Sequence, residues 1–374
     1  MIATDEQRVS FGPAHALGIS AEEVRAFYEN NWPRRIALSL PRFYSWQFLD
    51  APENGGKDWN CLAVRDGQIL GVMGLNRRSF KMRGETIRAA ELTTWVVAEA
   101  ARGLGVGRGV MQSIQQLHDL TVGFGISDAA LPIYMTSGYR RLKHIPRYFR
   151  IYDIEAVRQY AKIERLGERL TRHWSTWPRP EVSATAVKAE ALSELGAVME
   201  RSHNLYIRDA AHLAWRYDRH PVYRYEAFSV SPRGGGPGRA GVILRRDEID
   251  GMRFLHVLDV LGAPEDVPLA LSFIDAFARE TGQAFADFYC TASAVTRHFL
   301  ATGWFSCGDD DCFQLMHLFY PPELRTPQTT SMVYWANDRM AELSSLGRLY
   351  ITKQDLDLDR PTLAFYEKHA LRSE

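Results

Sequence analysis

The chain has 374 residues, more than the roughly 100–200 of a typical domain, so we expect two folded units. Apolar residues make up 46% and charged residues 24%, which excludes a disordered, collagenous or coiled-coil protein. The 45 basic and 45 acidic residues give a formal charge of zero, which argues against a nucleic-acid partner.

The four cysteines form no C-x-x-C pair, and there is neither a leader pattern nor an apolar run near ~18 residues. These features predict a cytoplasmic protein with reduced thiols and no membrane insertion. The histidines show no metal-ligand spacing, so we expect no metal.

Helical and strand patterns alternate in the first 150 residues. In chain order they predict a helix over Ala21–Asn31, strands over Asn60–Val64, Ile69–Leu75 and Ile87–Val97, and a helix over Val110–Leu120. A hairpin signal at Asp66-Gly67 separates the first two strands.

Prolines mark the junction between the two expected units. The charged, helical stretch Asp153–Trp177 is followed by Pro178 and Pro180, which a helix cannot accommodate, so we expect an extended connector there. The glycine-rich segment Arg233–Gly238 predicts a hairpin loop rather than a phosphate-binding turn, because no helix pattern follows it.

Two pairs of segments suggest an internal repeat. Phe43–Pro52 aligns with His212–Pro221 at a constant offset of 169, which matches a tryptophan, an aromatic residue two positions later and a proline. Ile133–Tyr139 aligns with His298–Trp304 at an offset of 165. The matches predict a duplicated domain, and two unrelated α/β units are the alternative.

A glycine-rich turn, Arg102–Gly109, lies between a strand and a helix, where backbone N–H groups bind phosphate. No Gly-Lys-Ser/Thr follows, which excludes the Walker motif. The G-x-G-x-x-G pattern also fails, because its third glycine would fall on Arg108 or Val110.

The turn does fit R-x-x-G-x-G, at Arg102, Gly105 and Gly107. Further along, Tyr134 precedes the pair Gly138-Tyr139 by four residues. With these two motifs the sequence resembles the GNAT family of acyl-CoA-dependent N-acyltransferases. The resemblance implies a mixed α+β fold with two GNAT-like domains, each a mostly antiparallel mixed sheet flanked by helices.

The resemblance also implies acetyl-CoA or another acyl-CoA as co-substrate, whose pyrophosphate the turn binds. The residues expected to do so are Arg102, Gly103, Leu104, Gly105, Val106, Gly107 and Arg108. The second copy has Gly262–Pro268 in place of the turn and Phe299 in place of Tyr134, so we expect only the first copy to bind acyl-CoA. Ser127 departs from the asparagine that is frequent in the family.

Four segments are expected along the chain. They are a GNAT domain that binds acyl-CoA at 1–152, a helical and proline-rich linker at 153–182, a degenerate GNAT-like domain at 183–322, and a C-terminal helix and tail at 323–374.

Three residues are candidates for the chemistry that the resemblance implies. Tyr134 is the candidate acid, because a phenol can protonate the leaving thiolate; a buried aromatic is the alternative reading. Glu91 is the candidate base, by a spacing similar to that of histone-acetyltransferase members; a salt-bridge partner is the alternative. The backbone N–H near Val97 is expected to polarise the thioester carbonyl.

The acceptor is expected to be a small amine. A tail at Arg348–Pro361 resembles acetyltransferase-like proteins of surface-polysaccharide loci, which favours an amino sugar or its nucleotide-linked form. Candidate acceptor-binding residues are Trp46, Trp215, His220 and Asp355. An aminoglycoside, a peptide amine or a non-catalytic CoA-binding scaffold are alternatives, and a homodimer is possible.

Overall fold

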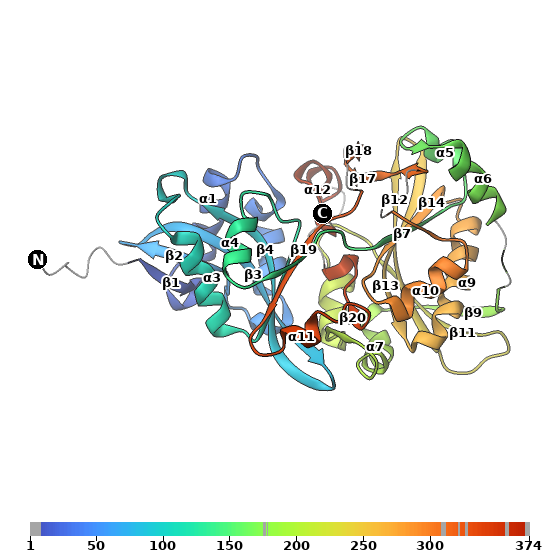
Figure 1. Ribbon diagram of the computed structural model, residues 1–374, viewed down its shortest axis with the longest axis horizontal. Helices are drawn as coiled ribbons and strands as arrows, with labels where there is room; N and C mark the ends of the chain where they lie inside the picture. The colour runs from blue at the N-terminus through green and yellow to red at the C-terminus, as the bar shows by residue number, and fades with distance from the viewer. Residues whose placement is uncertain are drawn as a thin grey trace, which may run out of the picture.

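The computed structural model describes residues 9–174, 177, 179–307, 312–320, 322–325, 328–355 and 359–370. Pro178 of the predicted connector therefore lies outside the described residues. Two mixed sheets, each flanked by helices, form the two halves of the molecule (Figure 1). This architecture confirms the expected fold class. The C-terminal segment, red in Figure 1, lies between the halves.

The first sheet has the order β1-β2-β3-β4-β5-β19-β6, and β10 and β20 extend it from β3. Its pairs are antiparallel apart from β4 with β5 and β10 with β20. The strands are β1 (Ser10–Pro13), β2 (Cys61–Arg65), β3 (Gln68–Met82), β4 (Glu85–Val97), β5 (Leu120–Phe124), β6 (Arg140–Leu142), β10 (Asn204–Tyr206), β19 (Met332–Ala336) and β20 (Leu349–Tyr350).

The second sheet has the order β15-β7-β14-β13-β12-β11-β9 and a parallel pair, β13 with β14. Its strands are β7 (Arg147–Ile151), β9 (Val182–Val187), β11 (Glu226–Pro232), β12 (Ala240–Ile249), β13 (Met252–Gly262), β14 (Phe285–Tyr289) and β15 (Phe305–Ser306). Two short ladders pair β8 (Lys162–Ile163) with β16 (Phe313–Gln314) and β17 (Met316–Phe319) with β18 (Pro322–Leu324).

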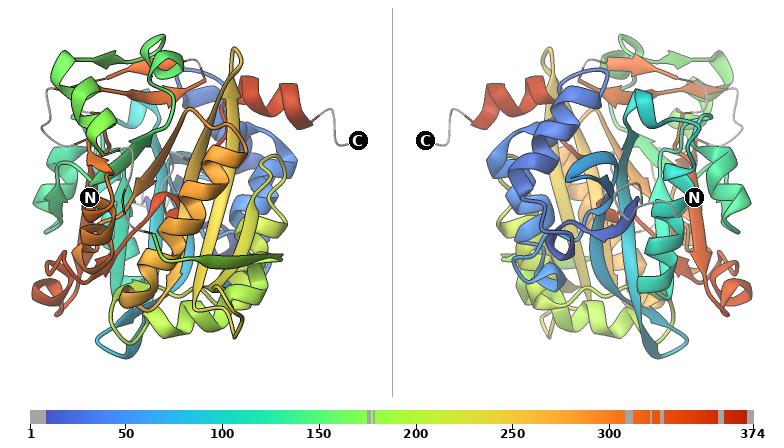
Figure 2. Two further views of the ribbon diagram at one scale, coloured as in Figure 1. Left: turned by 90° about the vertical axis from the view of Figure 1, so that its right-hand side faces the viewer. Right: turned by 90° about the vertical axis from the view of Figure 1, so that its left-hand side faces the viewer.

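Helices cover the outer faces of both sheets. Figure 2 shows α1 and α3 in front of the first sheet and α9 and α10 in front of the second. The helices are α1 (Ala21–Asn31), α2 (Pro41–Tyr44), α3 (Val106–Leu117), α4 (Leu131–Thr136), α5 (Ile154–Arg158), α6 (Arg165–His173), α7 (Ser193–Met199), α8 (Ala210–Leu213), α9 (Val267–Glu280), α10 (Ser293–Ala301), α11 (Met340–Leu343) and α12 (Leu363–Ala370). Among the described helices, none has the length and apolar character needed to cross a bilayer.

Strand pairing cuts across the boundaries expected at residues 152 and 323. Strand β7 lies in the N-terminal segment, yet it pairs with β14 and β15 of the second sheet. Strand β19 lies in the C-terminal segment and pairs with β5 and β6 of the first sheet. Strand β10 of the expected second domain also joins the first sheet, through β3. Strands are therefore exchanged in both directions, which ties the two sheets together.

The internal repeat is visible in the secondary structure. Helix α2 continues into a π-helical turn, η4 (Ser45–Leu49), and α8 continues into the turn η8 (Ala214–Asp218), with all bounds shifted by 169 residues. Later in each copy, Gly138 and Gly303 have left-handed φ values of 87° and 83°. These matches are the ones that two copies of one fold would show.

The sequence correctly predicted one helix and two hairpin connections from local patterns. Helix α1 has the predicted bounds, and its N-terminal Ser20 forms a capping box with Glu23. The Asp66-Gly67 turn has φ values of 52° and 75°, as a type I′ hairpin requires. The segment Arg233–Gly238 connects the antiparallel strands β11 and β12, as predicted for a hairpin loop.

Two helix predictions were wrong at their ends. Helix α3 begins at Val106 rather than Val110, because Gly105 caps it in the left-handed conformation, and it ends at Leu117, before β5. The stretch Asp153–Trp177 is not one helix. It divides into α5, β8 and α6, since β8 pairs with the distant β16.

Candidate functional site

Strands β4 and β5 separate partway along the first sheet. Their parallel pairing runs from Ala89 with Leu120 to Leu92 with Gly123 and ends there. Strand β4 continues to Val97, paired with β3 alone. The divergence leaves unpaired β4 backbone beyond Leu92, facing the side that β5 has left.

A β-bulge marks the point of divergence. The register between β3 and β4 shifts between Met73 and Leu75, so that Thr93 and Thr94 stand opposite Gly74. A Cβ at Gly74 would collide with the Thr93 hydroxyl. The Tyr28 hydroxyl of α1 donates to the Thr94 carbonyl at 3.1 Å, which fixes the bulge from the helix side.

The unpaired part of β4 offers backbone N–H groups. The N–H of Ala98 donates to the Leu70 carbonyl at 2.9 Å, toward β3. Because successive amides of a strand alternate in direction, the N–H of Val97 and that of Trp95 point away from β3. Val97 therefore remains a candidate carbonyl-binding residue. Trp95 is a second candidate that the sequence analysis missed, because the bulge before it leaves no signal in the sequence.

The glycine turn leads from β4 into α3. Gly103 and Gly105 have φ values of 80° and 77°, and a Cβ at either position would contact nothing within 4 Å. Arg102, Leu104 and the two glycines are exposed, so the backbone of the turn that leads into α3 lies at an open surface. No acidic side chain occupies the first turn of α3. The turn thus has the geometry of an anion-binding site.

The other predicted turn residues have different surroundings. Val106 and Gly107 are buried and Arg108 is exposed. A Cβ at Gly107 would lie 3.0 Å from the Trp95 ring and 3.1 Å from Ile133. Glycine at this position therefore lets α3 pack closely on the unpaired end of β4.

Tyr134 lies beside the divergence of the strands. It belongs to α4, is 2% exposed, and packs edge-on against Trp95 at 5.3 Å and Tyr139 at 5.0 Å between ring centroids. Its hydroxyl lies 3.5 Å from the position that a Cβ on Gly123 would occupy. The predicted acid is thus close to the last paired residue of β5.

Glu91 lies on β4, just before the bulge. It is 7% exposed, and its carboxylate lies 3.6 Å from Arg78 Nη1, so it takes part in an ion pair. It lines a cavity of about 30 Å³ between the copies, together with Asn76, Trp46 and Trp215. Glu91 is therefore a salt-bridge partner, which was the alternative, and it also faces a cavity, as the candidate base would need to.

The two repeated tryptophans meet at the interface of the copies. Their rings stack with centroids 5.1 Å apart. Trp46 Nε1 donates to the Trp215 carbonyl at 3.1 Å, and Trp215 Nε1 donates to the Trp46 carbonyl at 2.7 Å. Each ring covers one face of the other, and both line the cavity that contains Glu91.

His220 lies on the other side of the tryptophan pair. Its ring is 3% exposed and meets the Trp46 ring edge-on at 4.3 Å. Its Nδ1 accepts backbone hydrogen bonds from Val222 at 3.1 Å and Tyr223 at 2.9 Å, and burial holds its pKa well below the usual value. His220 and Trp46 also line a separate, open pocket of about 670 Å³.

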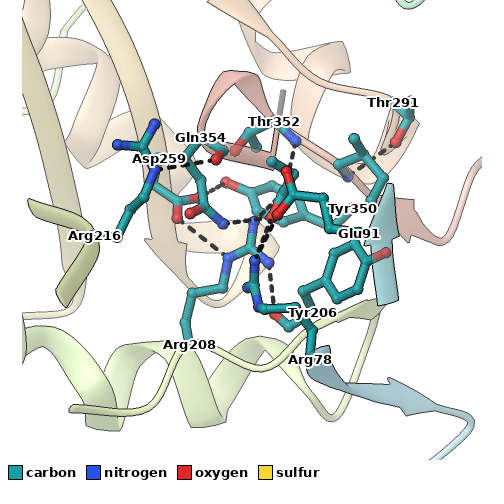
Figure 3. A network of polar contacts seen from close by, with 12 residues as sticks. Arg78, Glu91, Tyr206, Arg208, Arg216, Asp259, Thr291, Tyr350, Thr352 and Gln354 are labelled. Carbon is teal, nitrogen blue, oxygen red and sulfur yellow. Dashed lines mark hydrogen bonds and ion pairs between the residues drawn. The ribbon is translucent and has the colours of Figure 1, made fainter. Parts of the chain in front are cut away.

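Asp355 is fully buried and belongs to an ionic network that includes Arg208 and Arg78. Figure 3 shows these two arginines beside Glu91 and Asp259. The carboxylate of Asp355 accepts from Arg208 at 2.6 Å and from the Thr352 backbone N–H at 3.1 Å, and it lies 3.7 Å from Arg78. Arg78 thereby connects Asp355 with Glu91. Residues 356–358 of the predicted tail lie outside the described residues.

The second copy lacks the open turn. Its helix α9 is preceded by a 3-10 turn, Pro264–Asp266, and Asp266 pairs with Arg239 at 2.6 Å. A carboxylate therefore stands where the first copy has exposed glycine. Phe299 packs on Trp304 at 4.9 Å, as Tyr134 packs on Tyr139. Within the described residues, no group of three or more His, Cys, Asp or Glu side chains could hold a metal ion.

Comparison with known proteins gives a family match and a fold match. Residues 21–123 match the model of the Acetyltransferase (GNAT) family. No curated protein matches the chain significantly.

Three solved structures share the fold. A GCN5-related N-acetyltransferase from Anabaena variabilis has a TM-score of 0.55 at 11% identity, with 87% of this chain and 72% of that chain covered. A probable N-acyltransferase from Enterococcus faecalis has a TM-score of 0.55 at 11% identity, with coverage of 88% and 72%. A GCN5-related N-acetyltransferase from Kribbella flavida has a TM-score of 0.50 at 16% identity, with coverage of 90% and 73%.

Proposed function

We propose that this chain, whose residues 21–123 form an acetyltransferase domain of the GNAT family, transfers an acyl group from acyl-CoA to the primary amine of a small acceptor. The observation that carries the proposal is the divergence of β4 and β5 after Leu92 and Gly123. The open glycine turn lies at the end of the diverging β4, and Tyr134 lies beside the last pair. A thioester held by the turn would extend into this gap.

Direct attack of the amine in a ternary complex accounts for the residues present. The neutral amine attacks the thioester carbonyl, whose developing negative charge the N–H of Trp95 or Val97 stabilises. The C–S bond breaks, and Tyr134 donates its proton to the CoA thiolate. Glu91 accepts a proton from the amine, directly or through water.

Acyl-CoA binding is expected in the first copy alone. The exposed glycine turn before α3 supports this, as does Asp266 before the corresponding helix of the second copy. Calorimetric titration with acetyl-CoA and longer acyl-CoAs should give one saturable site per chain. Absence of binding by every acyl-CoA would overturn the proposal.

A charge introduced at the turn tests the location of the site. Leu104 is 62% exposed in the turn, and Leu300 is 49% exposed on α10 of the second copy. Leu104→Asp should weaken acetyl-CoA binding at least ~10-fold, because it sets a carboxylate against the pyrophosphate. Leu300→Asp is the matched control and should bind like the wild type.

The acceptor amine is expected to enter at the cavity beside Glu91. An amino sugar or its nucleotide-linked form is one candidate, and its support is the resemblance of the tail, of which Gln354 and Asp359 line this cavity. Aminoglycosides and peptide amines belong in the same screen. A chain that bound CoA but acylated no amine would instead be a CoA-binding scaffold.

A further inference from the structure

The second copy has a polar cavity at the position that corresponds to Glu91. On β4, Glu91 pairs with Val122 of β5; on β13, His256 pairs with Asp287 of β14, each 165 residues later. Arg245 stands opposite His256 as Asn76 stands opposite Glu91. The second copy thus repeats the strand pairing around Glu91, with His256, Asp287 and Arg245 at the equivalent positions of Glu91, Val122 and Asn76.

This second cavity has a volume of about 50 Å³, and His256, Arg245, Lys353 and Arg360 are among its lining residues. Since one water needs roughly 10–15 Å³, the cavity holds about three to five waters, or a carboxylate group. Arg360 also lines the cavity beside Glu91, so the two cavities meet at this side chain. Arg360 Nη1 donates to Thr94 Oγ1 of the β4 bulge at 2.6 Å.

Buried nitrogens of residues that line the second cavity have no hydrogen-bond partner among the described residues; they include His256 Nε2, Arg245 Nε and His317 Nδ1. His256 is fully buried and Arg245 is 4% exposed. His256 Nδ1 lies 2.8 Å from Lys353 Nζ and 2.5 Å from Asp287 Oδ1. The 2.5 Å contact requires Nδ1–H to donate to Asp287, because a bare nitrogen would repel the carboxylate. Nε2 then carries a proton only in the imidazolium form, which an anion in the cavity would stabilise.

Around this cavity three carboxylates, Asp287, Asp359 and the cavity-lining Asp247, are shared by four cations, so within the described part of the chain the ionic cluster has one more cation than anion. The cations are Arg147, Arg216, Arg245 and Lys353, and Arg245 is paired with both Asp247 and Asp359. Asp287 is the carboxylate shared by Arg147, at 2.8 Å, and Lys353, at 3.8 Å. Burial lowers the pKa of Lys353 to about 8 despite Asp287. Because Lys353 shares the single charge of Asp287 with Arg147, a further anion beside Lys353 would stabilise its charged form.

We propose that this cavity binds a carboxylate of the acceptor, whose amine lies at Glu91 in the adjoining cavity. The acceptor is then an amino acid or a molecule with an amino-acid-like end. The inference rests on the proposed acyl transfer for the role of Glu91, whereas the carboxylate site rests on Lys353, His256 and Arg245 themselves.

The test compares amines with and without a carboxylate. The probes are glycine, β-alanine, 4-aminobutyrate and 6-aminohexanoate, each matched with the alkylamine of the same chain length. Binding to the full chain saturated with CoA is measured by calorimetry, and N-acylation with acetyl-CoA is measured in parallel. At least one amino acid should bind ~10-fold or more tightly than its alkylamine.

Variants assign the preference to the second cavity. Lys353→Gln and, separately, His256→Leu should abolish the preference and leave alkylamine binding within ~2-fold. Lys368→Gln, the same change at an exposed lysine of α12, is the matched control and should retain it. Circular dichroism checks that each variant is folded, and two variants with different chemistry guard against a fold defect in one.

The outcomes separate this inference from the proposed function. Acylation of alkylamines and amino acids with equal binding would overturn the carboxylate site and leave the transferase standing. A carboxylate preference without any acylation would support the site and overturn the transferase. A preference that survives both variants, or no binding of any probe, would overturn the carboxylate site.

Discussion

The hydroxyl of Tyr134 is the group whose removal tests the chemistry most directly. Tyr134→Phe should lower kcat for acyl transfer ~100-fold or more, because the thiolate would leave without a proton donor. The KM for acetyl-CoA should stay within ~2-fold, since the ring and its packing on Trp95 remain. Thiol release in the steady state measures both.

Tyr139→Phe is the matched control for this variant. Its ring packs on Tyr134, but its hydroxyl bonds to Thr121 at 2.7 Å, inside the protein. Its kcat should stay within ~3-fold of wild type. Equal loss of kcat in the two variants would show that packing, rather than proton donation, is what Tyr134 supplies.

The variant Glu91→Gln tests whether Glu91 is the general base while leaving the fold intact. Glu91→Gln keeps the side-chain size beside Arg78 and removes the charge. It should lower kcat ~10-fold near neutral pH and change the acidic limb of the pH–rate profile, because a carboxylate would no longer accept the amine proton. Identical profiles for variant and wild type would mean that the amine loses its proton through water alone.

At the scale of elements, the sequence predicts helices and turns that depend on neighbouring residues, but it does not predict which distant strands pair. The capping box at Ser20 and the Asp66-Gly67 turn act through neighbouring residues, so the sequence predicts α1 and the first hairpin. The exchange of β7 and β19 between the sheets depends on pairing across the whole chain, and either strand would suit either sheet by its own residues. No local pattern distinguishes those choices.

The same contrast applies to the candidate site. The spacing of Arg102, Gly105 and Tyr134 carried the family resemblance, because backbone turns and helix faces fix such spacings locally. The candidate Trp95 N–H was missed because a bulge shifts the register by one residue, which no alternation pattern records. The meeting of His256 with Lys353 joins residues far apart in the chain, so it required the fold.

The left-handed glycine at the start of α3 gives a prediction for that element. Gly105→Ala should destabilise the fold by ~1 kcal/mol through backbone strain, since no atom lies within 4 Å of the added Cβ. Acetyl-CoA binding should also weaken several-fold, because the turn that presents the amides is displaced. Thermal unfolding and calorimetry measure the two effects.

Gly18→Ala provides the comparison for this prediction. Gly18 has a φ of 72° and equally open surroundings, but it precedes α1, outside the turn. It should show a similar loss of stability with unchanged acetyl-CoA affinity. Equal affinity loss in both variants would mean that the Gly105 effect reflects general stability rather than the geometry of the turn.

At the scale of the whole molecule, the exchanged strands and the Trp46–Trp215 pair predict that the two copies unfold together. Trp46→Ala should cost ~3–5 kcal/mol and lower a single unfolding transition, because the ring packs between the copies and its Nε1 bonds across them. Calorimetry checks this. Two separate unfolding transitions, only one of which shifts in Trp46→Ala, would contradict this prediction.

The double variant Trp46→Ala with Trp215→Ala extends this prediction. Because each indole donates to the other residue's carbonyl, the first substitution already breaks the stack and one hydrogen bond. The loss in the double variant should therefore fall short of the sum of the single losses by ~1 kcal/mol or more. Additive losses would mean that the two rings contribute independently.

The buried Lys353 makes the stability of the molecule depend on pH in a definite direction. In the folded chain its pKa is lowered from 10.5 to about 8, with burial as the largest cause. The unfolded chain therefore binds more protons between these values, and the free energy of unfolding should rise as pH rises through this window. The charged groups that act on Lys353 are Asp287, Arg245, Asp359 and Arg147, and His256 contacts it.

Comparison with Lys353→Gln isolates this contribution. The difference in unfolding free energy, wild type minus variant, should increase by ~1–2 kcal/mol between pH 7.5 and 9.5, since each unit of pKa shift is worth ~1.4 kcal/mol. Urea unfolding at several pH values measures it. The buried tyrosines and cysteines are present in both chains, so their titration cancels in the difference. A difference that does not change with pH would mean that Lys353 keeps its ordinary pKa in the folded chain, and that the cluster around Asp287 already compensates its charge.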